Sequence, residues 1–256
     1  FDGMGEYLGP YLQERVNGVT TEMYPVGPNS IAGTGYEVTL TNGRLTSLRY
    51  YVGRFDSSAV PSIEYHELFS DLSTADVYRE MDLLDFCAEQ GGTVFVVTDV
   101  TDYRITVFSA DGSVERAIEP GVARLPKTDE EIRSEIEEFD DSHTGDRAYT
   151  GGYEPSPYHP LIELAGVDGD GRLWVRRLDA AEGYLFDVWD SMGSLACQVM
   201  LEDVAGDLEL TFHVDRYGVL GANLDSDWHP RVYMLVLDDS ERSELQRNPG
   251  TAENHT

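Results

Sequence analysis

The chain has 256 residues, of which 41% are hydrophobic and 11% aromatic, and these proportions fit a globular protein with a sizeable core. Its 48 acidic residues outnumber its 18 basic ones and give a formal net charge of −30. Such a surface repels phosphate backbones and anionic membranes, so nucleic-acid binding is excluded and a basic protein partner is favoured. No run of about 20 apolar residues, the length that spans a bilayer, is present.

The N-terminal part mixes strand signals with one segment of different character. The sequence opens at Phe1 with neither a Met nor a signal-like basic and apolar run, which fits a processed chain or a piece of a longer protein. Processing would imply an extracytoplasmic (periplasmic or secreted) location. Residues 1–19 form an N-terminal segment, and strand signals begin at 20–26. Asn42-Gly43 predicts a hairpin turn between strands. Residues 56–82 carry apolar residues at mixed spacing and are expected to hold one or two short inserted helices.

Residues 83–119 give the clearest strand pattern, with four strands predicted. They are expected at 84–88, 93–98, 103–108 and 113–118. The last two are joined by Ser109-Ala110-Asp111-Gly112, an Asp-Gly hairpin signal. The second strand is apolar at every position, as expected where sheets pack on both faces.

This pattern repeats along the chain. Gly92 opens GTVFVVTDVTDYRITVFSADGSV and Gly171 opens GRLWVRRLDAAEGYLFDVWDSMGSL, each a Gly, an apolar strand, an Asp (Asp99 or Asp179), a loop and a second strand. A third copy begins at Gly218. Repeated antiparallel strand pairs predict a propeller or another array of stacked sheets.

A second insert is expected over residues 120–160. Thr128 and Glu131 have the spacing of a capping box, in which the two residues satisfy each other's backbone amides at the start of a helix. Ile132, Ile136 and Phe139 follow at helical spacing. A loop rich in Gly, Ser, Pro and Tyr then leads to the next strands.

Three runs resemble bacterial six-bladed β-propellers of the NHL and TolB-like kind: VDGDGRLWV from Val167, FDVWDSMG from Phe186 and ITVFSADG from Ile105. The resemblance covers roughly residues 84–238. It implies an all-β, propeller-like array of antiparallel three- to four-stranded blades in one domain over 20–239. Two short helical inserts, about 56–82 and 120–160, interrupt this array, and a flexible polar tail of residues 240–256 follows it.

The array is incomplete in the sequence. Only three blades are legible, and the last, beginning near Leu208, lacks its fourth strand. Residues 20–26 are the candidate for closing that gap. Because an incomplete ring exposes sheet edges and apolar faces, which proteins normally cover, we expect a partner subunit on the open side.

Two cysteines, Cys87 and Cys197, lie in apolar strand-like stretches and fit buried thiols, with a disulfide between adjacent blades as the alternative. Lys127 is the only lysine. A GC-rich genome would produce that bias, and adaptation of an acidic surface to a saline habitat is the rival explanation.

Several acidic groups are candidate metal ligands, but each also has a simpler interpretation. Asp168 and Asp170 begin like a calcium loop, yet Arg172 stands where a further ligand belongs, which favours a hairpin turn. A solvated loop is the simpler interpretation of the two other clusters, which are Asp140, Asp141, His143 and Asp146, and Asp225, Asp227 and His229. The third possibility is a channel site, as in propeller lactonases, made by Asp99, Asp179 and Asn223.

Four aromatic residues predicted in loops are candidates for partner binding: Tyr149, Tyr153, Tyr158 and Trp228. Packing of these rings against their own loops is the alternative. No nucleophile elbow, phosphate loop or dinucleotide motif is present, so no catalytic residue and no cofactor are predicted.

The sequence thus favours a non-catalytic accessory subunit that docks on a larger protein complex, with a membrane complex or a basic protein as candidate partners. A divalent-cation-dependent hydrolase or lactonase with a site in the propeller channel is the alternative. Binding of a small ligand or glycan by the tyrosine-rich loop is a third option.

Overall fold

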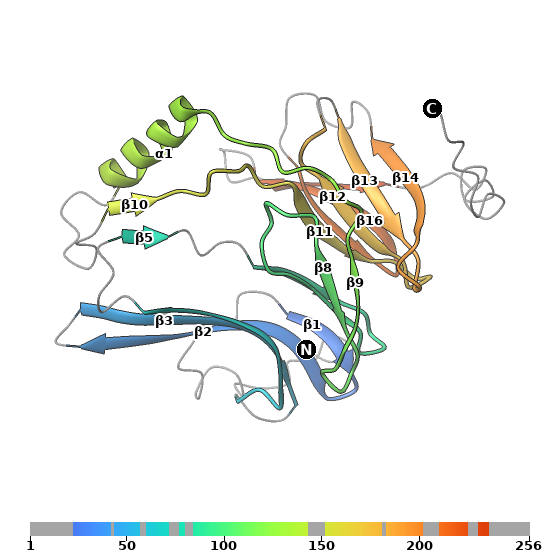
Figure 1. The fold of residues 1–256 in the computed structure, drawn as a ribbon. Helices are drawn as coiled ribbons and strands as arrows, with labels where there is room; N and C mark the ends of the chain where they lie inside the picture. The colour runs from blue at the N-terminus through green and yellow to red at the C-terminus, as the bar shows by residue number, and fades with distance from the viewer. Residues whose placement is uncertain are drawn as a thin grey trace. The chain divides into compact units, whose positions relative to one another are not determined.

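The structure is a computed structural model that describes residues 23–41, 44–56, 60–71, 77–79, 84–142, 152–180, 183–201, 210–224 and 230–235 (Figure 1). The chain divides into two compact units, Phe1–His159 and Pro160–Thr256. The described residues are mostly β-strand in antiparallel sheets, as the sequence predicts, and they contain one α-helix. The expected N-terminal segment 1–19 and tail 240–256 lie outside them.

The first unit opens with a four-stranded antiparallel sheet of long strands. Its strands follow chain order: β1 (Met23–Gly27), β2 (Ser30–Thr41), β3 (Arg44–Phe55) and β4 (Ile63–Asp71). Thr41 pairs with Arg44, so the hairpin predicted from Asn42-Gly43 is confirmed at its flanking residues, while 42 and 43 lie outside the described part.

The helices expected within 56–82 are wrong wherever the structure describes that segment. Residues 63–71 form β4, and Val77–Arg79 form a short strand, β5. Tertiary packing explains the difference: β4 pairs along β3, and Tyr65 is buried with its ring 5.6 Å from that of Phe108. A bulge in β4, where Tyr65 is passed over opposite Val52 and Gly53 of β3, disturbs the alternation of apolar residues that would have identified a strand.

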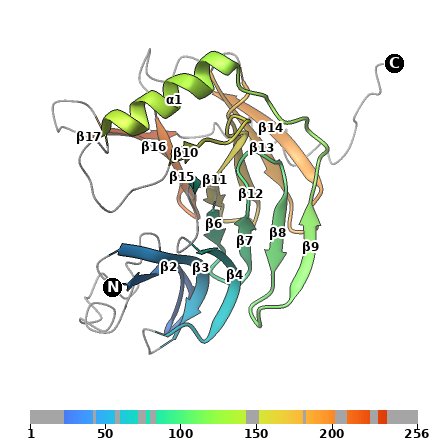
Figure 2. The ribbon, with the colours of Figure 1, turned by 60° about the vertical axis from the view of Figure 1, so that its left-hand side comes forward.

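The second sheet of this unit confirms the four strands predicted over 83–119. It consists of β6 (Asp85–Ala88), β7 (Val94–Val97), β8 (Ile105–Phe108) and β9 (Val114–Ile118), which lie side by side in chain order (Figure 2). Every side chain of β7 is buried, as the uninterrupted apolar run predicts.

The two sheets of the first unit share an apolar core. Its members come from both sheets: Val26, Ala32, Val52 and Tyr65 from the first, and Phe86, Val94, Val96 and Phe108 from the second. Arg54 of β3 adds a polar link, since its Nη1 donates to the Ala110 carbonyl in the turn before β9 at 3.2 Å. Burial of a phenylalanine such as Phe86 stabilises the pair of sheets by about 1.5–3 kcal/mol.

The second unit is built on one seven-stranded sheet. Its spatial order is β14-β13-β12-β11-β15-β16-β17. The bounds are β11 (Ile162–Val167), β12 (Leu173–Arg177), β13 (Tyr184–Trp189), β14 (Leu195–Leu201), β15 (Thr211–Asp215), β16 (Gly218–Leu224) and β17 (Pro230–Leu235).

Two antiparallel groups of strands meet in this sheet at a single parallel contact, where Gly166 pairs with Val214. A Cβ on Gly166 would lie 2.1 Å from the Val214 carbonyl oxygen, and Gly166 has φ +130°, so only glycine fits there. A core on one side of both groups includes Trp174, Phe186 and Phe212. The sheet therefore curls around an apolar core made by its own side chains.

Short strands from the two segments expected to be inserts pair with each other in the structure. β5 pairs in parallel with β10 (Gly152–Glu154), and helix α1 (Asp129–Ser142) packs on β10 (Figure 1). We call β5, α1, β10 and the flanking segments 120–128 and 155–159 the insert lobe. Residues 63–71 of the first expected insert belong instead to the four-stranded sheet, and the sequence does not predict that β5 pairs with β10.

Candidate functional site

Helix α1 presents an unusually polar surface. Eight of its fourteen residues are acidic, Arg133 is its only basic residue, and none of its side chains is fully buried. Ile132, Ile136 and Phe139 are half-buried at the helical spacing predicted from the sequence. The helix therefore rests on one narrow apolar stripe and displays the rest of its circumference.

The start of α1 is fixed by the predicted capping box, which the structure confirms. The backbone N–H and the hydroxyl of Thr128 both donate to the Glu131 carboxylate, at 2.7 and 2.8 Å, and the Glu131 N–H donates to the Thr128 hydroxyl at 3.3 Å. These contacts, led by the Thr128 backbone amide and with help from His159, lower the pKa of Glu131. The carboxylate also lies at the favourable end of the helix dipole.

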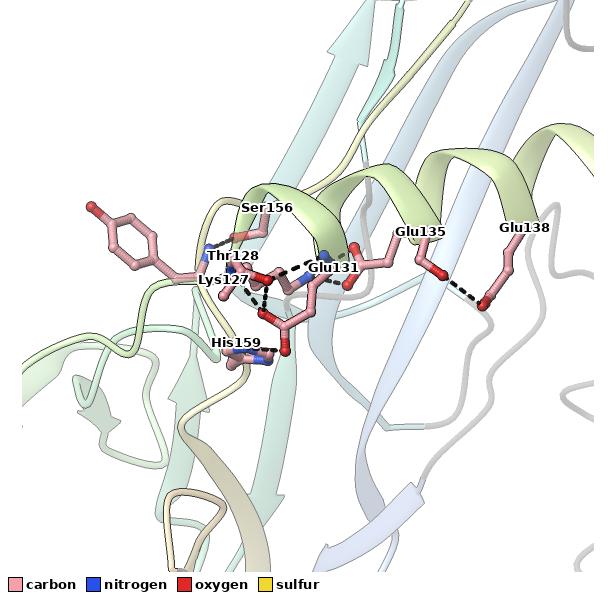
Figure 3. A network of polar contacts seen from close by, with 9 residues as sticks. Lys127, Thr128, Glu131, Glu135, Glu138, Ser156 and His159 are labelled. Carbon is pink, nitrogen blue, oxygen red and sulfur yellow. Dashed lines mark hydrogen bonds and ion pairs between the residues drawn. The ribbon is translucent and has the colours of Figure 1, made fainter.

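The only lysine of the chain anchors the next turn of α1. The Lys127 side chain is 6% exposed, and its Nζ lies 2.6 Å from Oε1 and 2.8 Å from Oε2 of Glu135 (Figure 3). A buried ammonium needs a partner, because its desolvation is costly when it stands alone. Lys127 thus ties the segment before α1 to the second turn of the helix.

A strap of backbone hydrogen bonds holds both flanks of the helix together. The Lys127 N–H donates to the Pro157 carbonyl at 3.0 Å, and the His159 N–H donates to the Leu125 carbonyl at 2.9 Å. His159 Nε2 also lies 3.4 Å from Glu131 Oε1, so the strap and the capping box join in one network (Figure 3). The lobe is thereby closed by directional polar contacts.

Two of the four aromatics predicted in loops lie in the insert lobe, where Tyr153 is part of strand β10 and not of a loop. Both contact neighbours within the lobe. The Tyr153 ring stacks on Phe139 at 4.5 Å with an interplanar angle of 11°, and Arg124 lies over the Tyr158 ring at 5.3 Å. Tyr149 and Trp228 lie outside the described residues. Tyr153 and Tyr158 are half-buried, so each retains some exposed ring surface beside α1.

Two of the three predicted channel residues, Asp99 and Asp179, accept hydrogen bonds from nearby residues of their own turns. Asp99 accepts from the Thr101 N–H at 2.9 Å and hydroxyl at 2.6 Å, and lies 3.3 Å from Arg124. Asp179 accepts from Arg177 Nε at 2.7 Å in the second unit. Asn223 belongs to β16. Asp99 is thus in one unit and the other two residues are in the second, and both carboxylates serve as turn and ion-pair residues.

The hairpin interpretation of Asp168 is confirmed. Its carboxylate accepts from the backbone amides of Asp170 and Arg172, from Arg172 Nε and from the Trp174 indole, all within 3.0 Å. Asp140 and Asp141 are exposed at the end of α1, while His143, Asp146, Asp225, Asp227 and His229 lie outside the described part. Among the residues described, no cluster of His, Cys, Asp and Glu has a metal-binding arrangement. Cys87 and Cys197, both described, form no disulfide.

The structure also contains polar clusters in which arginines pair with acidic residues, and the sequence did not predict them. Arg49 on β3 donates to Glu64 at 2.5 Å and Glu67 at 2.7 Å, and these hydrogen bonds raise its pKa. Asp56 accepts from the Ser30 hydroxyl and from Arg54, which lowers its pKa to about 2. Cross-strand pairing of partners far apart in the chain carries no local sequence signal; the basic residue at a half-buried strand position is the one available hint.

A further cluster lies in the second unit, where Asp187 is buried on β13. Gln198 of β14 donates to it at 2.7 Å, and Arg177 lies 3.6 Å away. The same Arg177 holds Asp179. This arrangement satisfies a buried carboxylate with one cation and one amide, which is a structural use of charge.

No family model and no curated protein match the chain. Among the solved structures that match is "KlHsv2 with loop 6CD replaced by a Gly-Ser linker", with 10% sequence identity and a TM-score of 0.37 over 87% of this chain and 71% of that one. A likeness at this level carries no argument about fold family or function. No helix among the described residues is long and apolar enough to cross a membrane.

Proposed function

We propose that the chain is a non-catalytic, propeller-like interaction subunit, similar to bacterial six-bladed NHL and TolB-like propellers, that acts outside the cytoplasm and docks on a larger protein complex. The insert lobe is its docking element, and the partner surface is basic. The stacked antiparallel sheets serve as the scaffold that carries this lobe.

The observation that supports the proposal is the way α1 is held. The helix contributes no fully buried side chain, and yet its start and its flanks are fixed by the capping box, by Lys127 and by the strap. A helix that only filled a core would bury a wider face. Because eight of its residues are acidic, the displayed surface complements a basic partner, which the net charge of −30 would also steer toward it.

The hydrolase alternative lacks such an observation. Its two carboxylates, Asp99 and Asp179, accept hydrogen bonds from their own turns and pair with Arg124 and Arg177. A carboxylate neutralised by an arginine is a weaker ligand for a cation.

The test is the native mass of the protein in material gently extracted from its source organism, measured for wild type and for two charge-matched variants. The first variant carries Glu137→Lys and Glu138→Lys on the exposed face of α1. The second carries Glu115→Lys and Glu119→Lys, which change the same charge on exposed positions outside the insert lobe.

We expect wild type and the Glu115/Glu119 variant in a large assembly, and the Glu137/Glu138 variant at the mass of a single free chain. Wild type recovered as a free chain would refute the docking function. Wild type in an assembly together with an unaffected Glu137/Glu138 variant would refute α1 as the docking surface.

A further inference from the structure

The edge strands of the described sheets differ in how they are protected. Four sheets give eight edge strands, namely β1, β4, β5, β6, β9, β10, β14 and β17. Seven of them contain a charged residue or a proline, which are the usual means of preventing another strand from pairing with an open edge. Strand β14, with the sequence LACQVML, contains neither. It stands out in a chain in which 26% of residues are charged.

Strand β9 is the matched comparison for β14, because the two end their sheets in the same way. Each follows a four-residue turn closed by the same backbone bond, Gly112 N–H to Ser109 carbonyl and Gly193 N–H to Asp190 carbonyl, both 2.9 Å. Each also has a bulge at the same place, so that Glu115 and Ala196 are the two residues passed over in the pairing.

The two strands differ in the residue at the bulge position. Strand β9 has Glu115 there and Arg116 next to it, whereas β14 has Ala196 followed by Cys197. Charges on β9 therefore stand where β14 has small uncharged side chains. The turn and the bulge of β14 match those of β9, but β14 lacks the charged side chains that protect the β9 edge from pairing.

Strand β14 also exposes apolar side chains along its length. Leu195 is 47% exposed and Met200 46%, and Met192 in the preceding turn is 79% exposed. On its inner side β14 pairs with β13, and no described strand pairs with its outer side (Figure 1). An open backbone row flanked by apolar side chains is the surface used in β-strand addition.

We infer that the outer edge of β14 binds an extended segment of a partner protein, which adds as a further strand. Backbone hydrogen bonds would supply the affinity, and apolar side chains at alternate positions of that segment would contact Leu195 and Met200. The segment carries Lys or Arg at its ends, because the net charge of −30 favours cations and Asp190 lies beside the start of β14. The same charge disfavours a second copy of this chain, since two such bodies repel.

This inference rests on the proposed function only in treating the chain as a binding protein; the site differs from the insert lobe. The test uses the full chain and synthetic peptides whose central part matches the seven-residue length of β14. One peptide alternates valine and threonine between terminal lysines, a second has glutamates in place of the lysines, and a third has a proline at its centre. Binding is measured by fluorescence anisotropy.

Two variants separate the β14 edge from edges in general. Ala196→Glu gives β14 the charge that β9 carries at the corresponding position, and Ala117→Glu adds a charge to the exposed, already protected edge of β9. We expect the lysine peptide to bind wild type, with at least about tenfold loss for Ala196→Glu and less than about twofold change for Ala117→Glu. The glutamate and proline peptides should bind more weakly, and unfolding curves of both variants verify that they fold.

Three results would overturn the inference: no binding of the lysine peptide to wild type, equal loss in both variants, or a wild-type dimer that Ala196→Glu converts to monomer. The last would assign the edge to a second copy. The Glu137/Glu138 variant of α1 should bind the peptide like wild type. If the peptide-binding test contradicts a site at β14, the native-mass test of α1 is unaffected. If the native-mass test contradicts docking by α1, the peptide-binding test of β14 is likewise unaffected.

Discussion

The stacked sheets and the insert lobe belong to the same compact unit but depend on different forces. The sheets share an apolar core in which Phe86, Val94 and Val96 have no exposed surface. In the lobe, α1 has no fully buried side chain and is fixed by a capping box, one buried ammonium and a strap of backbone hydrogen bonds. Apolar burial is non-directional and insensitive to pH, whereas each polar contact needs its own partner in the correct charge state.

This difference implies a hierarchy of stability. Regions with few buried apolar contacts open at lower free energy than the core, and binding elements are commonly drawn from such regions. We therefore expect the lobe to loosen before the sheets.

Removal of an aromatic ring should cost far more in the sheets than in the lobe. Phe86→Ala creates a cavity in the core shared by the two sheets and should reduce the free energy of unfolding by about 3–5 kcal/mol. Phe139→Ala removes a half-buried ring that stacks on Tyr153 and should cost about 1 kcal/mol. Urea denaturation followed by fluorescence measures both, and equal losses would contradict the comparison.

The buried ion pair of the lobe should respond asymmetrically to loss of its partners. Glu135→Ala leaves the ammonium of Lys127 buried and unpaired, which should destabilise the docking of α1 by about 3 kcal/mol. Lys127→Met keeps the apolar stem and leaves a carboxylate that is 33% exposed and can be hydrated, so its effect should be clearly smaller. Hydrogen exchange of the α1 amides gives the measurement. A larger effect of Lys127→Met would show that the ammonium is not desolvated.

Acid should release the capping box before it releases the polar cluster of the first sheet. The pKa of Glu131 is lowered in the folded chain, so its stabilisation is complete above its ordinary unfolded pKa and is lost as pH falls through the folded value. Asp56, held by Ser30 and Arg54, has a pKa of about 2 and should stay ionised further into the acid range. Carboxyl chemical shifts followed from pH 6 downward test the order.

Thr128→Ala provides the control for that titration. Removal of the hydroxyl should move the pKa of Glu131 back toward its ordinary range and leave that of Asp56 unchanged, because only Glu131 accepts from Thr128. A Glu131 carboxylate that titrates at or below the pH of Asp56 would reverse the proposed order of the two regions.

Local sequence rules predicted those elements whose cause is local. The four strands over 83–119 follow from turn signals and apolar runs, and the start of α1 follows from the Thr128–Glu131 spacing. β4 was missed because its pairing with β3, with a bulge in the register, decides its conformation. The pairing of Tyr78 with Tyr153 joins two inserts that are distant in the chain, and no periodicity encodes it.

The candidate site was predictable only in part. Tyr153 and Tyr158 were predicted as loop aromatics, but Tyr153 lies in strand β10, and the partners Phe139 and Arg124 depend on how the lobe closes. The acidic character of α1 can be read from composition, whereas the anchoring role of Lys127 requires the fold. Recognising the unprotected edge of β14 requires both the sequence and the fold. The sequence shows that the strand has no charged residue, and the fold shows that it lies at the edge of a sheet.

Burial of Lys127 has a practical consequence for chemistry on this protein. As the only lysine, it supplies the one side-chain primary amine in the sequence, and that amine is enclosed against Glu135. Acylating reagents and lysine-specific proteases should therefore find their single internal target only while α1 is undocked. Lysine-directed labelling becomes a one-site reporter of lobe opening, with no engineered probe needed.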